Sequence, residues 1–176
     1  VVTSGTVVVD GQTVSSMNDN QLSEYRAKTI GFIFQFYNLL PSLTAYENVA
    51  LTKTIVKNAQ DPGKMLEAVG LANDKHKFPS QMSGGEQQRV SIARAIVKKP
   101  RLILADEPTA ALDCATSIEV LSFIENIVKS QGTTVVMVTH NAEIAKMADR
   151  VVKIRNGKID SIVINCKPLS AVELSW

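Results

Sequence analysis

Two consecutive carboxylates, Asp106 and Glu107, follow directly after an apolar run at residues 102–105. A run of this length predicts a buried strand, and α/β sheets bind their ligands at the carboxyl ends of their strands. The two carboxylates would therefore lie where a ligand site is expected. Buried strands also often end in Asp for capping, so this pair by itself does not separate a functional site from a structural one.

A second chemically suggestive segment precedes that strand. Ser83 is followed by Gly84, Gly85 and Glu86, which is the spacing of a helix capping box. Two glycines at a helix N-terminus allow an anion to approach the backbone amides, and the helix dipole favours negative charge there. The segment is a candidate anion-binding site, and a plain capped helix start is the alternative.

The elements that must position these residues are predicted from hydrophobic periodicity and end signals. Gln35 lies just beyond one predicted strand and His140 just beyond another. Strands are predicted at 5–11, 30–34, 102–105, 133–139, 151–154 and 158–164, with an Asn156-Gly157 type I′ turn between the last two. Helices are predicted within 18–28, from a capping box that starts at Thr44, from Pro62 to Gly70, from Ser83 to Pro100, from a cap at Asp113 to Gly132, and at 142–148.

Apolar strands that alternate with helices indicate an α/β protein, with a mainly parallel sheet and helices on both faces. Residues 44–98 are predicted to be mainly helical and form an insertion within that order. The predicted organisation is therefore one domain over residues 1–176, with a helical subdomain at about 44–98 and an α/β core for the remainder.

The composition excludes several classes of function. The 176 residues carry 19 Lys and Arg against 17 Asp and Glu, and the basic residues are scattered, so no nucleic-acid partner is expected. Cys114 and Cys166 fit neither a disulfide framework nor a metal-binding pair, and they indicate a reducing compartment. The most apolar stretch, residues 30–40, is too short to span a bilayer. Any membrane association must therefore come through a partner.

Several segments together resemble the ATPase subunit of ABC transporters. They are Ser83-Gly84-Gly85-Glu86 with Gln87-Gln88-Arg89, then Asp106-Glu107-Pro108-Thr109, then Ala111-Leu112-Asp113, and finally His140 after an apolar strand. The resemblance covers about residues 3–160. It implies a P-loop NTPase-type fold whose α/β core is RecA-like, ATP and Mg²⁺ as cofactors, and transport-coupled ATP hydrolysis as the activity.

The resemblance assigns roles to the residues at the predicted strand ends. Asp106 resembles the Walker B carboxylate, which holds Mg²⁺ through water, and Glu107 resembles the base that polarises the attacking water. Gln35 resembles the Q-loop glutamine, which senses Mg²⁺ and the coupling helices of the transporter. His140 resembles the switch histidine that contacts the γ-phosphate.

The resemblance also implies partners. Ser83, Gly84, Gly85 and Glu86 resemble the signature loop, which binds the γ-phosphate of ATP held on the opposite subunit of a head-to-tail dimer. Asp113 resembles the D-loop aspartate that contacts that subunit. The implied partners are a second ATPase subunit and transmembrane permease subunits, with the protein at the cytoplasmic face of the cell membrane.

The sequence departs from the family pattern in two respects. Met82 and Glu86 stand where the family commonly has Leu and Gln, and both changes preserve size and helix compatibility. The Walker A motif G-x-x-x-x-G-K-S/T is absent from the 176 residues, and the chain opens at Val1 without an initiator Met. We therefore expect an N-terminal truncation, with the missing Walker A strand lying between the strands at 133–139 and 151–154. The fold would then be incomplete, and this chain alone inactive.

Residues 34–49 most resemble the lipoprotein-release and macrolide-export branch of bacterial ABC transporters. The favoured hypothesis is a transport ATPase, of an exporter or lipoprotein-release type, whose first part lies upstream. The second is a degenerate, non-catalytic ABC subunit that donates its signature loop to a partner's ATP site. The third is a stand-alone binding domain, which requires the matching segments to be coincidental.

Overall fold

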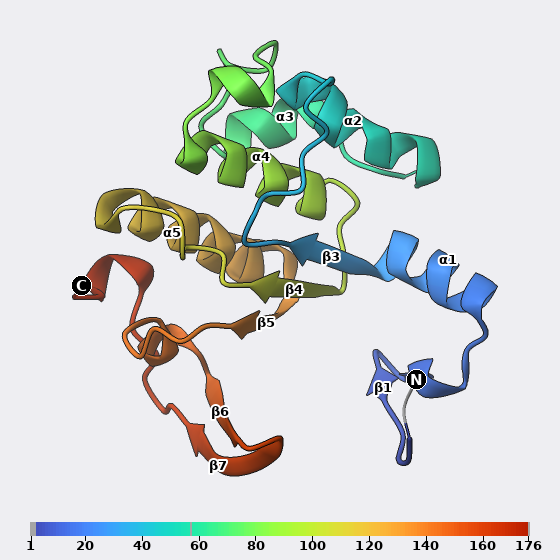
Figure 1. Ribbon diagram of the computed structural model, residues 1–176, viewed down its shortest axis with the longest axis vertical. Coiled ribbons are helices and arrows are strands. Elements are labelled where there is room, and N and C mark those ends of the chain that lie inside the picture. The colour runs from blue at the N-terminus through green and yellow to red at the C-terminus, as the bar shows by residue number, and fades with distance from the viewer. Residues whose placement is uncertain (1–2, 57, 176) are drawn as a thin grey trace.

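The computed structural model describes residues 3–56 and 58–175, so the predicted domain ends Val1, Val2 and Trp176 lie outside the described residues (Figure 1). The helices are α1 (Asp19–Thr29), α2 (Ala45–Ile55), α3 (Pro62–Ala68), α4 (Gly84–Ile96) and α5 (Cys114–Gln131). The strands are β1 (Val8–Val9), β2 (Gln12–Thr13), β3 (Ile30–Ile33), β4 (Leu102–Asp106), β5 (Thr134–Val138), β6 (Arg150–Arg155) and β7 (Lys158–Ile164). Short 3₁₀ turns are η1 (Val14–Ser16), η2 (Pro79–Gln81), η3 (Ile144–Met147) and η4 (Ala171–Glu173).

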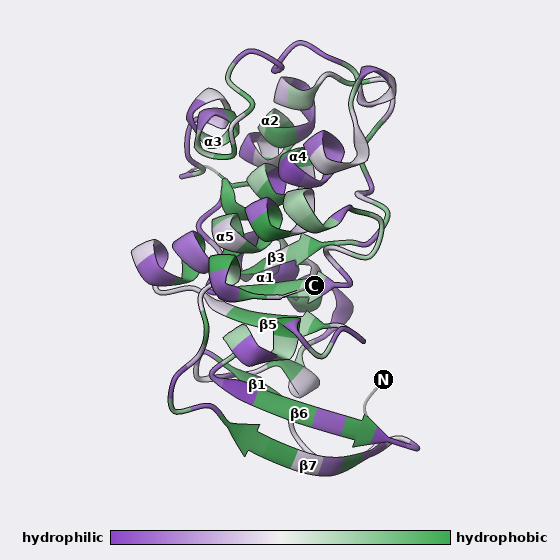
Figure 2. Ribbon diagram, turned by 90° about the vertical axis from the view of Figure 1, so that its left-hand side faces the viewer, coloured by the Kyte–Doolittle hydropathy of each residue, from purple (hydrophilic) through white to green (hydrophobic). Residues whose placement is uncertain are grey.

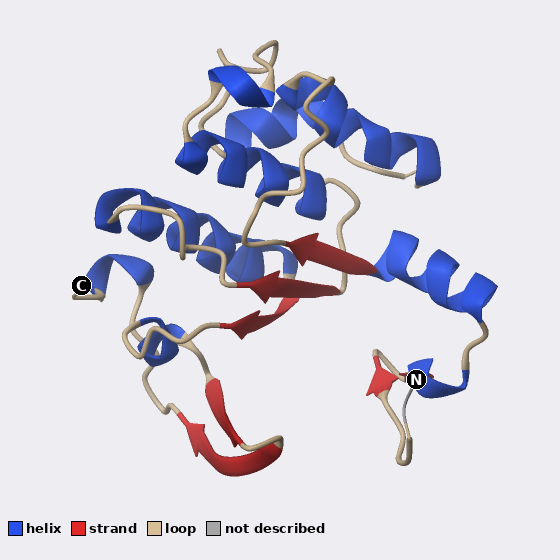
Figure 3. Ribbon diagram, viewed as in Figure 1, coloured by secondary structure: helices blue, strands red, loops and turns tan. Residues whose placement is uncertain are grey.

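The central sheet has the order β3-β4-β5 and is parallel, as predicted (Figure 3). Ile33 pairs with Ala105, and Asp106 pairs with Val138. This register brings the carboxyl ends of the three strands to one edge of the sheet. Residues that follow β3, β4 and β5 are therefore neighbours in space although they are far apart in the sequence.

Helices α4 and α5 cover one face of the central sheet (Figure 1). Ile33, Ile103 and Ala105 point to this face and are buried among apolar side chains of the two helices. Side chains alternate between the faces of a strand, so Val136 and Val138 of β5 point to the opposite face. They are 50% and 60% exposed. Within the described residues, the opposite face is therefore open at β5.

Helices α2 and α3 pack against each other and against the side of α4 that faces away from the sheet (Figure 1). Each begins at a capping residue, because the side chains of Thr44, Asp61 and Ser83 accept a hydrogen bond from the backbone amide three residues later. Such caps satisfy amides that have no partner within the helix. Local end signals thus account for the helices of residues 44–98, which we call the helical segment.

The short helix predicted at 142–148 is present only as the 3₁₀ helix η3, Ile144–Met147. The side-chain amide of Asn165 donates to the carbonyl oxygens of Ala145, at 3.2 Å, and Ala148, at 2.6 Å. Backbone acceptors of this segment are therefore occupied by a side chain from a distant part of the chain. The periodicity of residues 142–148 does not reveal a hydrogen-bond partner as distant as Asn165.

Two hairpins lie outside the central sheet. Asn156 and Gly157 have φ values of 49° and 73°, as the predicted type I′ turn requires, and β6 and β7 pair antiparallel on either side. A similar turn at Asp10-Gly11 joins β1 to β2, a ladder that the sequence did not predict. β5 and β6 lie in different sheets, and apolar residues recur along β6 and β7 (Figure 2).

Candidate functional site

Four of the predicted functional residues lie at the carboxyl edge of the central sheet. Gln35 is in the turn after β3, Asp106 is the last residue of β4, and Glu107 follows it. His140 lies just beyond the end of β5. The parallel register brings these strand ends together, so the structure places the four residues where the sequence predicted a ligand site.

Glu107 is held in a defined position at this edge. Its φ of 43° lies in the left-handed region that residues other than glycine rarely adopt, and its amide donates to the carbonyl oxygen of Val138 at 2.9 Å. Its Oε1 accepts a hydrogen bond from the backbone amide of His140 at 3.0 Å, and the ring Nδ1 of His140 lies 2.8 Å from the same oxygen. The Glu107 side chain is 18% exposed and that of His140 is 81% exposed. The carboxylate is thus fixed, while the imidazole stays accessible.

Asp106 and Gln35 are the other oxygen-bearing side chains predicted at this edge of the sheet. Asp106 is exposed and Gln35 is partly buried. Carboxylate and amide oxygens suit a hard cation such as Mg²⁺, which usually keeps several water and phosphate ligands. Among the described residues, no group of three or more His, Cys, Asp or Glu side chains is placed to hold a metal ion. The donor set therefore fits Mg²⁺ bound together with a phosphate compound, and not an all-protein metal cage.

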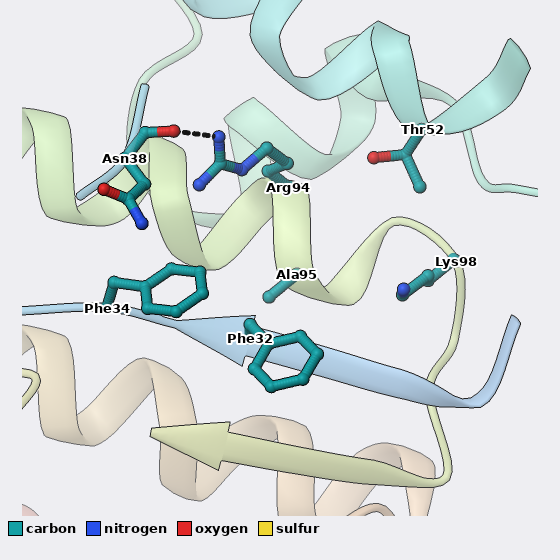
Figure 4. A pocket seen from close by; sticks show the side chains of 7 residues that line it. All are labelled: Phe32, Phe34, Asn38, Thr52, Arg94, Ala95 and Lys98. Carbon is teal, nitrogen blue, oxygen red and sulfur yellow. Dashed lines mark hydrogen bonds between the residues drawn. The ribbon is translucent and has the colours of Figure 1, made fainter. Parts of the chain in front are cut away.

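The turn that carries Gln35 is tied to α4. Tyr37 and Asn38 have positive φ values of 60° and 50°. The guanidinium of Arg94 on α4 donates to the carbonyl oxygen of Tyr37 at 2.8 Å and to that of Asn38, and Figure 4 shows the second of these hydrogen bonds. Arg94 lines a cleft of about 280 Å³ together with the stacked rings of Phe32 and Phe34, which are drawn in the same figure. The conformation of the turn therefore depends on α4.

Lys98 lines the same cleft (Figure 4). Its ammonium group donates to the carbonyl oxygens of Arg26, at 2.9 Å, and Ala27, at 2.8 Å, in the last turn of α1. Burial lowers the pKa of Lys98 from its usual 10.5 to about 8. The charged form is thus disfavoured at this position, although helix carbonyl groups partly compensate.

The signature loop, residues 83–86, opens α4 with a reciprocal cap. Ser83 Oγ accepts from the amide of Glu86 at 3.2 Å, and Glu86 Oε2 accepts from the amide of Ser83 at 2.6 Å. The hydrogen bond from the Ser83 backbone lowers the pKa of Glu86, and Lys77 Nζ lies 3.6 Å from its other oxygen. The loop therefore stabilises the start of α4.

Both glycines of the signature loop lie close to other segments. A Cβ on Gly84 would come within 2.8 Å of the Tyr37 hydroxyl, and a Cβ on Gly85 would come within 2.3 Å of Thr116 Cγ2. Gly85 thus allows α4 to approach α5 closely. The sequence suggested only anion access for these glycines, so the packing reason is a finding of the structure.

Asp113 caps α5 beside this contact. Its Oδ1 accepts from the Thr116 amide at 3.0 Å, and its Oδ2 accepts from the Thr116 hydroxyl at 2.8 Å. These hydrogen bonds lower the pKa of the Asp113 carboxyl. Because Thr116 also faces Gly85, the structure brings Asp113 close to the signature loop. The predicted residues therefore form two groups, one at the sheet edge and one where α4 meets α5.

Two polar residues of α4, Gln88 and Arg94, link these groups, and neither was predicted from the sequence to have a functional role. Gln88 is fully buried, and its side-chain amide donates to the carbonyl oxygen of Pro108 at 2.8 Å. Arg94 holds the turn after β3, as described above. The sequence does contain one signal for the burial of Gln88, because it lies on the same helical face as Gly85 and Ile92, and both of those residues are buried.

Comparison with known proteins bears on what this site does. A family model described as ABC transporter matches residues 1–110. The chain belongs to the ABC transporter family. A Mycoplasma pneumoniae protein named as an ABC transporter ATP-binding protein is 44% identical over 176 residues, which cover 98% of this chain and 38% of that protein. The chain thus spans little more than a third of that ABC protein.

Two further ABC proteins confirm the resemblance to ABC transporter ATPase subunits and the P-loop NTPase-type fold. The lipoprotein-releasing system ATP-binding protein LolD 2 of Caulobacter vibrioides is 41% identical over 161 residues, covering 89% of this chain and 71% of that protein. A dimeric post-hydrolysis structure of the ATP-binding cassette MJ0796, bound to ADP and Pi, matches with a TM-score of 0.83 and 34% identity. That match covers 92% of this chain and 74% of the cassette.

Proposed function

We propose that this protein is an ATP-hydrolysing subunit that powers an ABC-type membrane transporter. The observation that carries the proposal is the position of Glu107, whose carboxylate is held by His140 beside the exposed Asp106. A carboxylate fixed at the carboxyl edge of a parallel sheet can orient a water molecule and accept its proton. Membership of the ABC transporter family supports the same reaction.

The residues of the sheet edge would divide this work. Asp106 would hold Mg²⁺ through water, and Gln35 would contact the same ion, which neutralises phosphate charge when bound. Glu107 would orient the attacking water and take its proton. His140, exposed beside Glu107, would contact the γ-phosphate. The different exposure of the two carboxylates supports this division, because Asp106 is open to solvent whereas Glu107 is largely enclosed.

The signature loop and Asp113 would act on ATP held by a second ATPase subunit. Ser83, Gly84 and Gly85 lie at the N-terminal end of α4, where backbone amides and the helix dipole favour an anion. The solved cassettes that resemble this chain are dimeric, which supports pairing with a second ATPase subunit; we propose that the pair is head-to-tail. We place the loop on a helical subdomain at about 44–98, and the remainder of residues 1–176 in a partial RecA-like α/β core.

Transmembrane permease subunits are the second proposed partner, and they would hold the protein at the cytoplasmic face of the cell membrane. Phe36, next to Gln35, is 75% exposed, and Ile55 on α2 is 63% exposed. Thr52 of α2 lines the cleft beside the turn after β3. Exposed large apolar side chains suit a protein partner. None of the helices in the described ranges combines the length and apolar character needed to cross a membrane.

The similarity to LolD 2 of Caulobacter vibrioides supports a lipoprotein-release type system or a related exporter. The cargo would be selected by the permease subunits, because the residues described above concern nucleotide and coupling only.

The test is ATP turnover by the protein expressed from its complete open reading frame, compared with Glu107→Gln. We expect the unmodified protein to hydrolyse ATP. In the variant we expect turnover to fall by at least about 100-fold, because the proton acceptor is lost. ATP binding should be retained. The control is Glu24→Gln, which removes an exposed carboxylate paired with Lys28 and should leave turnover unchanged. Equal turnover in Glu107→Gln would remove Glu107 from its role.

A degenerate subunit that donates its signature loop to a partner's ATP site is the second candidate. The observation that favours it is the complete Ser83–Glu86 cap in a chain whose 176 residues contain no Walker A motif. It predicts no ATP turnover by the protein alone and ATP-strengthened binding to a subunit that carries the phosphate loop. In that complex Ser83→Ala would lower turnover, whereas Glu107→Gln would not.

A further inference from the structure

Gln88 makes a buried contact between α4 and the segment that follows β4. Its side chain is 0% exposed, and its Nε2 donates to the carbonyl oxygen of Pro108 at 2.8 Å. Its Oε1 is buried and has no hydrogen-bond partner among the described residues. A buried amide with one unpaired oxygen is a poor choice for stability alone, since an apolar side chain of similar shape avoids that cost. The hydrogen bond from Gln88 Nε2 to Pro108 therefore suggests a role for Gln88 other than stability.

The accepting carbonyl belongs to the residue directly after Glu107. Glu107 has a φ of 43°, a strained conformation that persists only when its surroundings impose it. Pro108 has no amide hydrogen, so its carbonyl is the only backbone hydrogen-bonding group of that residue. The neighbouring carbonyl of Glu107 is used by the amide of Ala110 at 3.2 Å. Gln88 thus holds the remaining backbone group on the C-terminal side of Glu107.

The opposite side of Glu107 is held by β5, through the carbonyl of Val138 and the contacts of His140. The conformation of Glu107 therefore depends on two supports, one from the sheet and one from α4. The support from α4 comes from the helix that begins with the signature loop. A shift of that helix would move the Gln88 amide, which donates to the carbonyl oxygen of Pro108.

We propose that Gln88 is a positioning residue for Glu107, which couples the signature helix to the catalytic carboxylate of the same subunit. The inference rests on the proposed ATPase function. Engagement of the signature loop by the partner's nucleotide would fix α4, and Gln88 would transmit that state to the Glu107 turn. Gln88 itself touches neither nucleotide nor water in this account.

The experiment compares Gln88→Met with the unmodified protein, each expressed from the complete open reading frame. Met has a similar length and no donor. The matched control is Gln87→Met, because Gln87 lies next to Gln88 on α4 but donates to the carbonyl of Met82 at 3.1 Å. We expect kcat for ATP hydrolysis to fall at least tenfold in Gln88→Met, with KM and ATP-dependent dimerisation unchanged. Gln87→Met should retain most of kcat.

Glu107→Gln provides the second comparison. If Gln88 acts through Glu107, Gln88→Met should not reduce the residual turnover of Glu107→Gln any further. A further fall of the same size in the double variant would overturn the proposal. So would an unchanged kcat in Gln88→Met, or a loss of KM and dimerisation in step with kcat.

Gln88→Glu keeps the proposal testable if Gln88→Met does not fold. A protonated carboxyl group can donate to Pro108, whereas an ionised one cannot. We expect the kcat of Gln88→Glu, relative to the unmodified protein, to fall as pH rises and the new carboxyl ionises. A flat ratio across pH would overturn the proposal. Absence of turnover in the unmodified protein would overturn the proposed function itself, whereas turnover that both Gln88 variants preserve would overturn this inference alone.

Discussion

His140 contacts Glu107 twice through one carboxylate oxygen. The backbone amide donates to Glu107 Oε1 at 3.0 Å, and the ring Nδ1 lies 2.8 Å from the same atom. An ionised carboxylate only accepts hydrogen bonds, so the contact from the ring requires a proton on Nδ1. The outward ring nitrogen, Nε2, is then the one available to a ligand. The pair therefore fixes both the carboxylate and the orientation of the imidazole.

Replacement of His140 should affect ATP turnover without affecting folding. We expect His140→Ala to lower ATP turnover by tenfold or more, because the carboxylate loses its contact with the ring, while the backbone contact keeps Glu107 near its place. Thermal stability should change little, since the His140 side chain is 81% exposed. The control is His76→Ala, which removes the other exposed histidine and should preserve turnover. Steady-state kinetics that show equal turnover in the two variants would contradict the prediction.

Gly85→Ala should destabilise the protein through packing. The new Cβ would lie 2.3 Å from Thr116 Cγ2, and overpacking of this kind costs about 1–3 kcal/mol. The higher helix propensity of Ala offsets part of that cost. Thr116→Ser removes Cγ2 but keeps the hydroxyl that donates to Asp113. The double variant should therefore recover most of the free energy of unfolding, as measured by urea denaturation.

The same pair of variants distinguishes packing from phosphate contact at Gly85. If the glycine serves only the approach of α4 to α5, the double variant should also recover ATP turnover. Recovery of stability without turnover would assign Gly85 to the ligand as well. Thr116→Ser alone is the control for the loss of the methyl group.

Asp113 should show separable roles as a cap and as a charge. Asp113→Ala removes the acceptors of two hydrogen bonds from Thr116 and should lower Tm, whereas Asp113→Asn keeps a side-chain oxygen for the amide and should lower Tm less. These bonds lower the pKa of Asp113, so their contribution holds at neutral pH and fades as pH falls through the lowered pKa. Thermal melts at pH 7 and pH 3 would test this. An equal Tm for both variants would contradict a capping role.

Lys98 should make stability depend on alkaline pH. Burial lowers its pKa from 10.5 to about 8 in the folded chain, so between these values the unfolded chain binds more protons. Stability attributable to Lys98 should therefore rise as pH increases from 8 towards 10.5. The difference in Tm between the unmodified protein and Lys98→Met should move in favour of the unmodified protein over that interval. Lys53→Met, at an exposed position on α2, controls for the removal of a lysine, and a constant difference for Lys98→Met would refute the prediction.

Local signals in the sequence predicted much of the fold and most of the candidate site. The caps at Thr44, Ser83 and Asp113 are confirmed, because capping depends on residues only three positions apart. Asp106 at the end of β4 and His140 just beyond β5 lie where short apolar runs predicted strand ends, but β5 is not buried, because its Val136 and Val138 are half exposed or more. The roles of these residues in ATP hydrolysis remain predictions.

The features that the sequence did not predict depend on contacts between distant segments. Gln88 stands in a polar run, and only the approach of Pro108 from the end of β4 makes it a buried donor. The helix expected at 142–148 is limited to the 3₁₀ helix η3, and carbonyl oxygens at its C-terminal end accept from the distant Asn165. Neither partner can be identified from the periodicity of the segment itself.

The pairing of β3 with β4 bears on how the chain folds. Ile30 pairs with Leu102, so the entire helical segment separates two adjacent strands. Closing so long a loop costs conformational entropy, and pairings between distant segments slow folding. The contacts of α2 and α3 with α4 are more local, so we expect them to form first and to bring the two strands within reach. Loss of the Thr44 or Ser83 cap should then slow folding more than it speeds unfolding.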